Sequence, residues 1–311
     1  MEPLRIATGN YGLTRPLKQG EVKTNLAFEF VEVPAITTDG MRPMVRSLAF
    51  DVCEMAFTTY LCARAAGKPI TAIPVFLTRN FHHWAAFTNV NSGIKTPKDL
   101  EGRQIGVNRG YTVTTGVWVR GILQHEYGVD LGKITWMPTD EEHVAEFKAP
   151  ANVDHRYLGK PIAELLKSGT LGAAVGDIRA DSPDIRPLIP DARQAGFAYY
   201  RKTGIYPVNH GLVVKNSLLE ARPSLAEELF HAFDAAKDIY LKRLDAGKEL
   251  TAADKNALEL REVVGGDPFP FGIAANRKAL EAINQYAVEQ HVLPARMAPE
   301  ELFAASTHGL G

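Results

Sequence analysis

One acidic residue stands in an otherwise apolar stretch of this chain and is the first candidate for chemistry. Glu54 lies within residues 52–55, a run of the kind that forms a buried strand. Burying a glutamate without a partner is costly, so Glu54 requires an arginine, a proton or a ligand hydroxyl. An ordinary buried pair would also explain it. His210, which opens a second expected strand, is another candidate proton carrier.

Arg79, His82 and His83 belong to the most polar cluster of the expected first lobe, which joins two expected strands. Histidine titrates near neutral pH and can donate or accept a proton. Adjacent residues on an extended chain point to opposite sides, so we expect one histidine to act and the other to be an ordinary packing or surface residue. The sequence has no His-x-His or His-Glu-x-x-His spacing, which weighs against a metal site here.

A candidate anion site lies at residues 108–112, where an expected strand ends and an expected helix opens. Backbone N–H groups and the dipole of a helix start attract a carboxylate at such a place. Asn108, Arg109, Gly110 and Tyr111 form this loop, and Arg109 can add a bidentate contact. The alternative is a capped helix beside a solvated arginine.

A similar turn follows the first expected strand and contains Asn10, Tyr11 and, a few residues later, Arg15. Gly9 and Gly12 on either side of it would let a ligand approach the backbone. A plain tight turn explains the pattern equally well. The spacing is not that of a dinucleotide-binding loop.

Two further strand ends contribute polar residues. Residues 140–143 end in His143 and include three acids, which either line a ligand site or form a solvated helix start. Asp177 ends another short apolar strand. We count His143 and Asp177 among the candidate substrate contacts.

The elements that must position these residues alternate between strand-like and helix-like segments, a pattern typical of a parallel sheet with crossover helices. A polar turn at 89–93 separates two such series, and the earlier pattern returns near residue 205. We therefore predict one lobe over 1–88 plus 208–311 and an inserted lobe over 89–207. Two crossings between lobes would make a hinge and a ligand cleft.

Composition limits the function further. The 311 residues are 45% hydrophobic and 23% charged with a formal net charge of −1, which predicts no binding to nucleic acid or membrane. The sequence lacks a run of 18 or more apolar residues and a secretory signal at its start. Two cysteines are too few for a disulfide framework. We expect a cytoplasmic protein.

Longer motifs resemble known families. Residues 96–107, together with residues 165–174, resemble the second lobe of type 2 periplasmic binding proteins. Residues 138–144, and residues 267–272 followed by Asn276 and Arg277, resemble 4,5-dihydroxyphthalate decarboxylase and its relatives. The cysteine tract of thiamine-pyrimidine synthases is absent. The resemblance implies an α/β fold of the type 2 periplasmic-binding-protein class, with two lobes joined by a two-strand hinge around a ligand cleft.

The resemblance also implies a reaction, the cofactor-independent decarboxylation of a dihydroxylated aromatic dicarboxylate such as 4,5-dihydroxyphthalate to protocatechuate and CO2. A ring hydroxyl para to the departing carboxylate can take up the electrons without a cofactor. We assign Arg15 and Arg109 to the carboxylate that stays, and Glu54 or His210 to the base. His82 or His83 would be the acid that protonates the ring carbon.

Two other functions fit the same sequence. A solute-binding protein that delivers an aromatic acid to a transporter or sensor would use the same cleft and anion contacts. A metal-dependent enzyme would assemble its histidine and glutamate ligands in space, without a spacing motif. We expect a small aromatic di-acid as the partner and no organic cofactor, and we leave divalent metal and self-association open.

Overall fold

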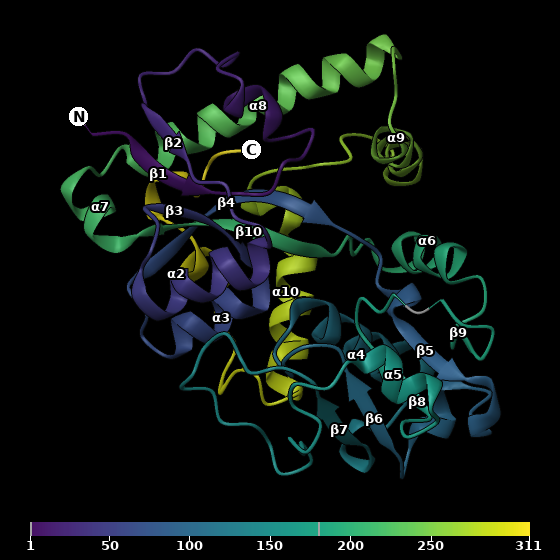
Figure 1. The fold of residues 1–311 in the computed structure, drawn as a ribbon. Helices are drawn as coiled ribbons and strands as arrows, with labels where there is room; N and C mark the ends of the chain where they lie inside the picture. Colours follow the sequence, from purple (N-terminus) through teal and green to yellow (C-terminus); the bar gives the residue numbers. More distant parts are fainter. Residues whose placement is uncertain (1, 180) are drawn as a thin grey trace. The chain divides into compact units, whose positions relative to one another are not determined.

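The computed structural model describes residues 2–179 and 181–311, which form two compact α/β units (Figure 1). The first unit comprises Met1–Arg79, Val208–Glu281 and Met297–Gly311. The second comprises Asn80–Pro207 and Ala282–Arg296.

The division differs from the predicted lobes in two ways. The first boundary lies after Arg79 rather than after residue 88, and Ala282–Arg296 belongs to the second unit. Tyr286 packs edge-on against Trp118 with ring centroids 5.7 Å apart, and Gln290 accepts a hydrogen bond from Arg120 Nε at 2.8 Å. These contacts draw the C-terminal segment into the second unit, so the chain passes between units four times and not twice.

The first unit is built on a five-stranded mixed sheet of order β2-β1-β3-β10-β4. Strands β1, β2 and β3 are parallel, whereas β10 is antiparallel to β3 and β4. The return strand therefore begins where β3 ends. The strands are β1 (Leu4–Ala7), β2 (Phe28–Phe30), β3 (Val52–Ala56), β4 (Ile70–Arg79) and β10 (Val208–Lys215).

Helix α8 covers one face of this sheet, and α2 and α3 lie on the other (Figure 1). Leu229 and Phe233 of α8 pack with Val75 and Leu212 in a buried core. The helices of the first unit are α1 (Arg15–Lys18), a π-helical turn (Ile36–Met41), α2 (Arg42–Ser47), α3 (Phe57–Ala65), α7 (Asn216–Ala221), α8 (Leu225–Ala246), α9 (Ala252–Val264) and the start of α10 (Ile273–Glu289).

The second unit has its own mixed sheet of order β7-β6-β8-β5-β9, in which β5 is antiparallel to β8 and β9. Its strands are β5 (Ala86–Asn89), β6 (Gln104–Val107), β7 (Thr135–Pro138), β8 (Ala173–Val175) and β9 (Ile185–Pro187). Its helices are α4 (Thr114–Tyr127), α5 (Ile162–Lys167) and α6 (Ala192–Thr203). No helix among the described residues is long and apolar enough to cross a membrane.

Short 3-10 turns complete the chain. In the second unit they cover His83–Ala85, Val90–Ser92, Pro97–Leu100 and Leu131–Lys133, and in the first Pro299–Leu302 and Ala305–Thr307. The turn at Pro97–Leu100 has a capping box in which Thr96 and Asp99 satisfy each other's backbone N–H groups. This turn leads directly into β6.

The loop over residues 267–272, part of the decarboxylase-like motif, is anchored by hydrogen bonds in the first unit. Asn276 is buried and donates through Nδ2 to Pro270 O at 2.9 Å and to Gly272 O at 2.7 Å. Arg79 Nη2 also donates to Pro270 O at 2.9 Å. Gly272 has a φ of +85°, and a Cβ there would lie 2.4 Å from Leu310 O, so only glycine fits.

Replacing Asn276 should destabilise the first unit. Asn276→Ala leaves the buried Gly272 carbonyl without its donor, and an unsatisfied buried acceptor costs about 1–3 kcal/mol. Urea unfolding should show a loss of this size in the free energy of unfolding. Asn25→Ala, at an exposed asparagine, is the matched control and should change it by no more than about 0.5 kcal/mol. Equal losses in the two variants would contradict the anchoring role.

Candidate active site

Glu54 is the centre of a polar cluster in the first unit. Its side chain has 0% exposure and accepts three hydrogen bonds. His210 Nδ1 lies 2.6 Å from Oε1, the Tyr11 hydroxyl donates to the same oxygen at 2.9 Å, and the Gly9 N–H donates to Oε2 at 2.8 Å. Of the two explanations left open for Glu54, the structure shows a buried pair, and its partner is the candidate base His210.

The strand register brings this pair together. Glu54 lies opposite Leu212 in the antiparallel ladder, and His210 is two residues from Leu212 along β10. Residues two apart on a strand share a face, so Glu54 and His210 are diagonal neighbours on one face of the sheet. Tyr11 comes from the turn that follows β1, the strand on the other side of β3.

The hydrogen bond to Glu54 determines which nitrogen of His210 is free. A carboxylate accepts, so Nδ1 carries the proton and donates it, which leaves a lone pair on Nε2. The His210 side chain retains 15% exposure, whereas Glu54 has none. The pair can therefore take a proton through Nε2 while the buried carboxylate stabilises the imidazolium that forms.

Tyr11 acts on Glu54 as a neutral donor. Burial raises the pKa of Tyr11 well above its usual range, and the charge of Glu54 and the hydrogen bond to it raise this pKa further. The phenol consequently keeps its proton through neutral and moderately alkaline pH. We predicted Tyr11 as a substrate contact, but its hydroxyl is already committed to Glu54.

Three buried polar atoms of the first unit have no hydrogen-bond partner among the described residues: Thr8 Oγ1, Thr78 Oγ1 and Asn209 Oδ1. Thr8 precedes Gly9, and Thr78 lies opposite His210 in the ladder between β10 and β4, whereas Asn209 adjoins His210 on β10 and so points to the opposite face of the sheet. Buried polar atoms are nearly always paired, so such a group marks a place where ligand hydroxyls can bind. We missed both threonines in the sequence, although Thr8 directly follows β1 and Thr78 lies near the end of β4.

In the second unit the predicted anion site is occupied by the chain itself. The carboxylate of Glu142 accepts hydrogen bonds from Tyr111 N at 2.5 Å, Thr112 N at 3.1 Å and Thr112 Oγ1 at 2.5 Å. A Cβ on Gly110 would lie 2.6 Å from this carboxylate. The prediction that these N–H groups are open to a substrate carboxylate is therefore wrong for this structure.

Tyr111 is also a packing residue and not an open contact. Its hydroxyl donates to Gln290 O at 3.1 Å, and the fully buried guanidinium of Arg120 lies 4.0 Å from its ring centroid. Arg109 takes a left-handed conformation with φ of 71° and is partly exposed. Its guanidinium has no hydrogen bond or ion pair to any residue that the structure describes.

Neither histidine assigned as the acid is placed to donate a proton. His83 has a side-chain exposure of 0%, and its Nε2 lies 2.7 Å from Glu126 Oε2 of α4. His82 is buried and stacks on Trp118 with ring centroids 6.2 Å apart. Both rings lie in the interior of the second unit, so the assignment of either one as a proton donor to substrate is withdrawn.

Of the other predicted substrate contacts, some are buried or bound to other parts of the chain and some are exposed. Arg79 binds the 267–272 loop instead of a ligand, and His143 is buried. Asp177 has an exposed side chain, and its carbonyl accepts a 2.5 Å hydrogen bond from Asn108 Nδ2. Asn10 and Arg15 are exposed, at the turn after β1 and at the start of α1.

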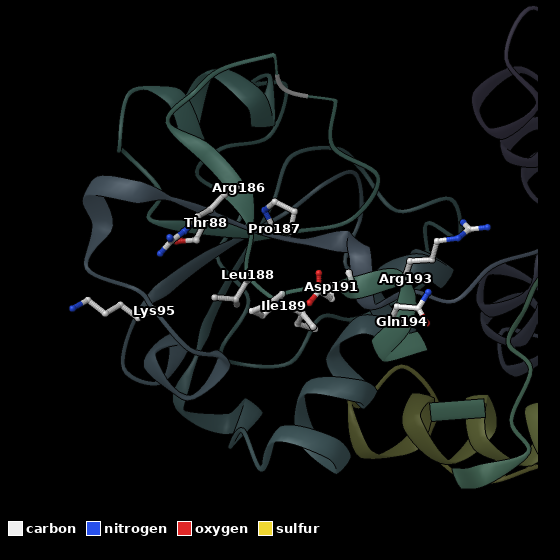
Figure 2. Close-up of a pocket in the computed structure, with 11 residues that line it drawn as sticks. Thr88, Lys95, Arg186, Pro187, Leu188, Ile189, Asp191, Arg193 and Gln194 are labelled. Atoms are coloured by element: carbon white, nitrogen blue, oxygen red, sulfur yellow. The ribbon is translucent and has the colours of Figure 1, made fainter. Parts of the chain in front are cut away.

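The second unit also has a surface pocket of about 690 Å³, shown in Figure 2. Leu188 and Ile189 lie at its centre, with Lys95, Arg186 and Arg193 around them. None of the predicted site residues lines it. Within residues 2–179 and 181–311, no three His, Cys, Asp or Glu side chains are grouped to hold a metal ion.

Comparison with solved structures defines the class of fold. The periplasmic aliphatic sulphonate-binding protein SsuA of Escherichia coli superposes with a TM-score of 0.54 at 14% identity, over 97% of this chain and 92% of that protein. A family model described as NMT1/THI5 like matches residues 39–158. The chain has the two-lobed α/β fold of type 2 periplasmic binding proteins, as the sequence predicted.

Sequence comparison gives the family. The 4,5-dihydroxyphthalate decarboxylase of Comamonas testosteroni is 31% identical over 326 residues, which covers 96% of this chain and 96% of that enzyme. The enzyme of the same name from Pseudomonas putida is 32% identical over 215 residues, 64% of this chain and 81% of its own length. The chain belongs to the 4,5-dihydroxyphthalate decarboxylase family.

Glu142 should make stability depend on pH. Burial raises the pKa of Glu142 above its usual range, and hydrogen bonds from Thr112 and Tyr111 and the charge of Arg120 offset part of the effect. The folded state then binds a proton more tightly than the unfolded chain. Its contribution to stability is complete below the unfolded pKa and is lost as pH rises through the raised folded pKa.

Urea unfolding of the wild type and of Glu142→Gln between pH 4 and 8 checks this. The free energy of unfolding of the wild type, relative to that of the variant, should fall as pH rises, by roughly 1.4 kcal/mol for each unit of pKa shift. Glu141→Gln, at the exposed neighbouring residue, is the control and should keep the pH dependence of the wild type. Parallel curves for the wild type and Glu142→Gln would refute the account.

Proposed function

We propose that this chain decarboxylates 4,5-dihydroxyphthalate to protocatechuate and CO2, with the Glu54–His210 pair as the base. Family membership supports the substrate and the reaction. The observation that carries the mechanism is the buried Glu54 carboxylate, 2.6 Å from His210 Nδ1, which leaves Nε2 as a proton acceptor.

The reaction needs an electron acceptor for the pair released when the C–C bond to the carboxylate breaks. In 4,5-dihydroxyphthalate each carboxylate is para to one hydroxyl. His210 Nε2 takes the proton of that hydroxyl, and the oxygen electron pair moves into the ring. The ring carbon that bears the carboxylate then takes up a proton. The C–C bond breaks, its electrons restore aromaticity, and CO2 leaves. The phenolate recovers its proton from His210, so each turnover consumes one proton from solvent.

The protein groups have separate tasks in this scheme. Glu54 holds His210 in the tautomer with a free Nε2 and stabilises the imidazolium. Thr8 and Thr78 supply polar atoms for the ring hydroxyls. Arg15, at the start of α1 in the same unit, is our candidate for the carboxylate that stays, because a guanidinium can form paired hydrogen bonds to it. The cytoplasmic location remains a prediction from the sequence.

A solute-binding function is the second candidate, because a sulphonate-binding protein shares the fold. Such a protein would bind an aromatic acid without changing it. Incubation with 4,5-dihydroxyphthalate separates the two functions, since release of CO2 supports the enzyme and tight binding without release supports the binding protein.

Removing either member of the pair should abolish most of the turnover. We expect His210→Gln and Glu54→Gln each to lower kcat by about 10²- to 10⁴-fold, the usual contribution of one placed acid–base group. CO2 release and the absorbance of protocatechuate measure this. His125→Gln is the matched control, because it breaks another His–Glu pair, 2.6 Å from Glu289, in the second unit. Near-normal turnover by His210→Gln would exclude His210 as the base.

Removal of divalent metal should leave turnover unchanged. The ring hydroxyl accepts the electrons in this mechanism, so no Lewis acid has to polarise the substrate. Activity measured after dialysis against EDTA, with a mock-dialysed sample as control, tests the point. Loss of activity that one divalent cation restores would favour the metal-dependent alternative.

A further inference from the structure

The two oxygens of the Glu54 carboxylate accept different numbers of hydrogen bonds. Oε1 receives both the His210 Nδ1–H at 2.6 Å and the Tyr11 hydroxyl at 2.9 Å. Oε2 receives the backbone N–H of Gly9 at 2.8 Å. The two donors share the negative charge of one oxygen. The hydrogen bond from Tyr11 therefore reduces the electrostatic stabilisation that Glu54 gives to protonated His210.

The turn after β1 fixes the Tyr11 hydroxyl in this position. The Tyr11 N–H donates to Thr14 Oγ1 at 2.9 Å, and the fully buried Thr14 hydroxyl donates to Gly9 O at 2.8 Å. The Tyr11 ring lies over Gly9 so closely that a Cβ there would be 2.3 Å from it. The turn places the phenol on Glu54 before any ligand binds.

We propose that Tyr11 is a positioning residue that limits the basicity of His210 by donating to the carboxylate oxygen that His210 shares. Its catalytic consequence rests on the proposed function, since it matters only if His210 is the base. A weaker base holds the proton less tightly and returns it to the phenolate more readily, so that the imidazole is again free for the next substrate near neutral pH.

The direction of the effect follows from the charges around His210. Glu54 of β3 and Tyr11 of the turn after β1 meet His210 at Oε1, whereas the Cys53 thiol, next to Glu54 on β3, points to the opposite face of the sheet. Arg79 of β4 lies opposite Val208 with its guanidinium on Pro270 O, and Lys18 of α1 donates to Thr8 O. Loss of the Tyr11 hydroxyl leaves Oε1 of Glu54 to His210, while Gly9 N–H stays on Oε2, so protonation of His210 should become easier.

NMR titration of histidine-labelled protein without substrate tests the proposal. The His210 signal is identified by its loss in His210→Gln. In Tyr11→Phe the midpoint of the His210 titration should move to higher pH by about half a unit or more. The free energy of such a shift is a fraction of that of one hydrogen bond to a charged group. Tyr240→Phe is the matched control, because it removes a 2.6 Å hydrogen bond from a tyrosine to Asp254 in the same unit. An unmoved or lowered midpoint in Tyr11→Phe overturns the proposal.

A second measurement tests the proposal even if Tyr11→Phe does not fold. Site-specific 3-fluorotyrosine at position 11 makes the phenol a stronger donor and should move the His210 midpoint to lower pH. An unchanged or raised midpoint contradicts the proposal. If the wild type releases CO2, the acid limb of kcat/KM should move with each NMR midpoint. Midpoints that move as expected in a protein that releases no CO2 would support the role of Tyr11 while rejecting the proposed reaction.

Discussion

The fully buried carboxylate of Glu54 is the constraint on which the candidate site depends. An ionised group without exposed surface persists only when hydrogen bonds replace its water, and two elements provide three of them. The turn after β1 supplies Tyr11 and Gly9, and β10 supplies His210. The need to satisfy one charge thus fixes the tautomer of a histidine, the place of a phenol and the shape of a turn.

Much of the fold followed from local sequence pattern. The strand expected before residues 108–112 is β6, and the helix expected after them is α4, which begins at Thr114. Sequence pattern did not show that β10 runs antiparallel, because periodicity carries no strand direction. It also missed α9, whose start has a capping box of Thr251 and Asp254. The end of α10 was placed in the wrong unit because its partners, Trp118 and Arg120, are distant in sequence.

The site was predictable only in part, for the same reason. Glu54 attracted attention because it interrupts an apolar strand, but its pairing with His210 depends on a register across 156 residues. His82 and His83 are of a residue type that can act as a general acid, yet packing against α4 buries both side chains. The 108–112 loop has the expected anion-binding geometry, but Glu142 of the same unit occupies it. Residue type indicated the chemistry, and tertiary contacts decided which residues can perform it.

The central claim is that His210 Nε2, held by Glu54, receives the proton of a ring hydroxyl. A crystal structure with protocatechuate bound tests it most directly. Our account places a ring hydroxyl oxygen within about 2.6–3.2 Å of Nε2 while Nδ1 stays on Glu54. A complex in which the hydroxyls contact other groups, with Nε2 out of hydrogen-bond reach, would contradict it.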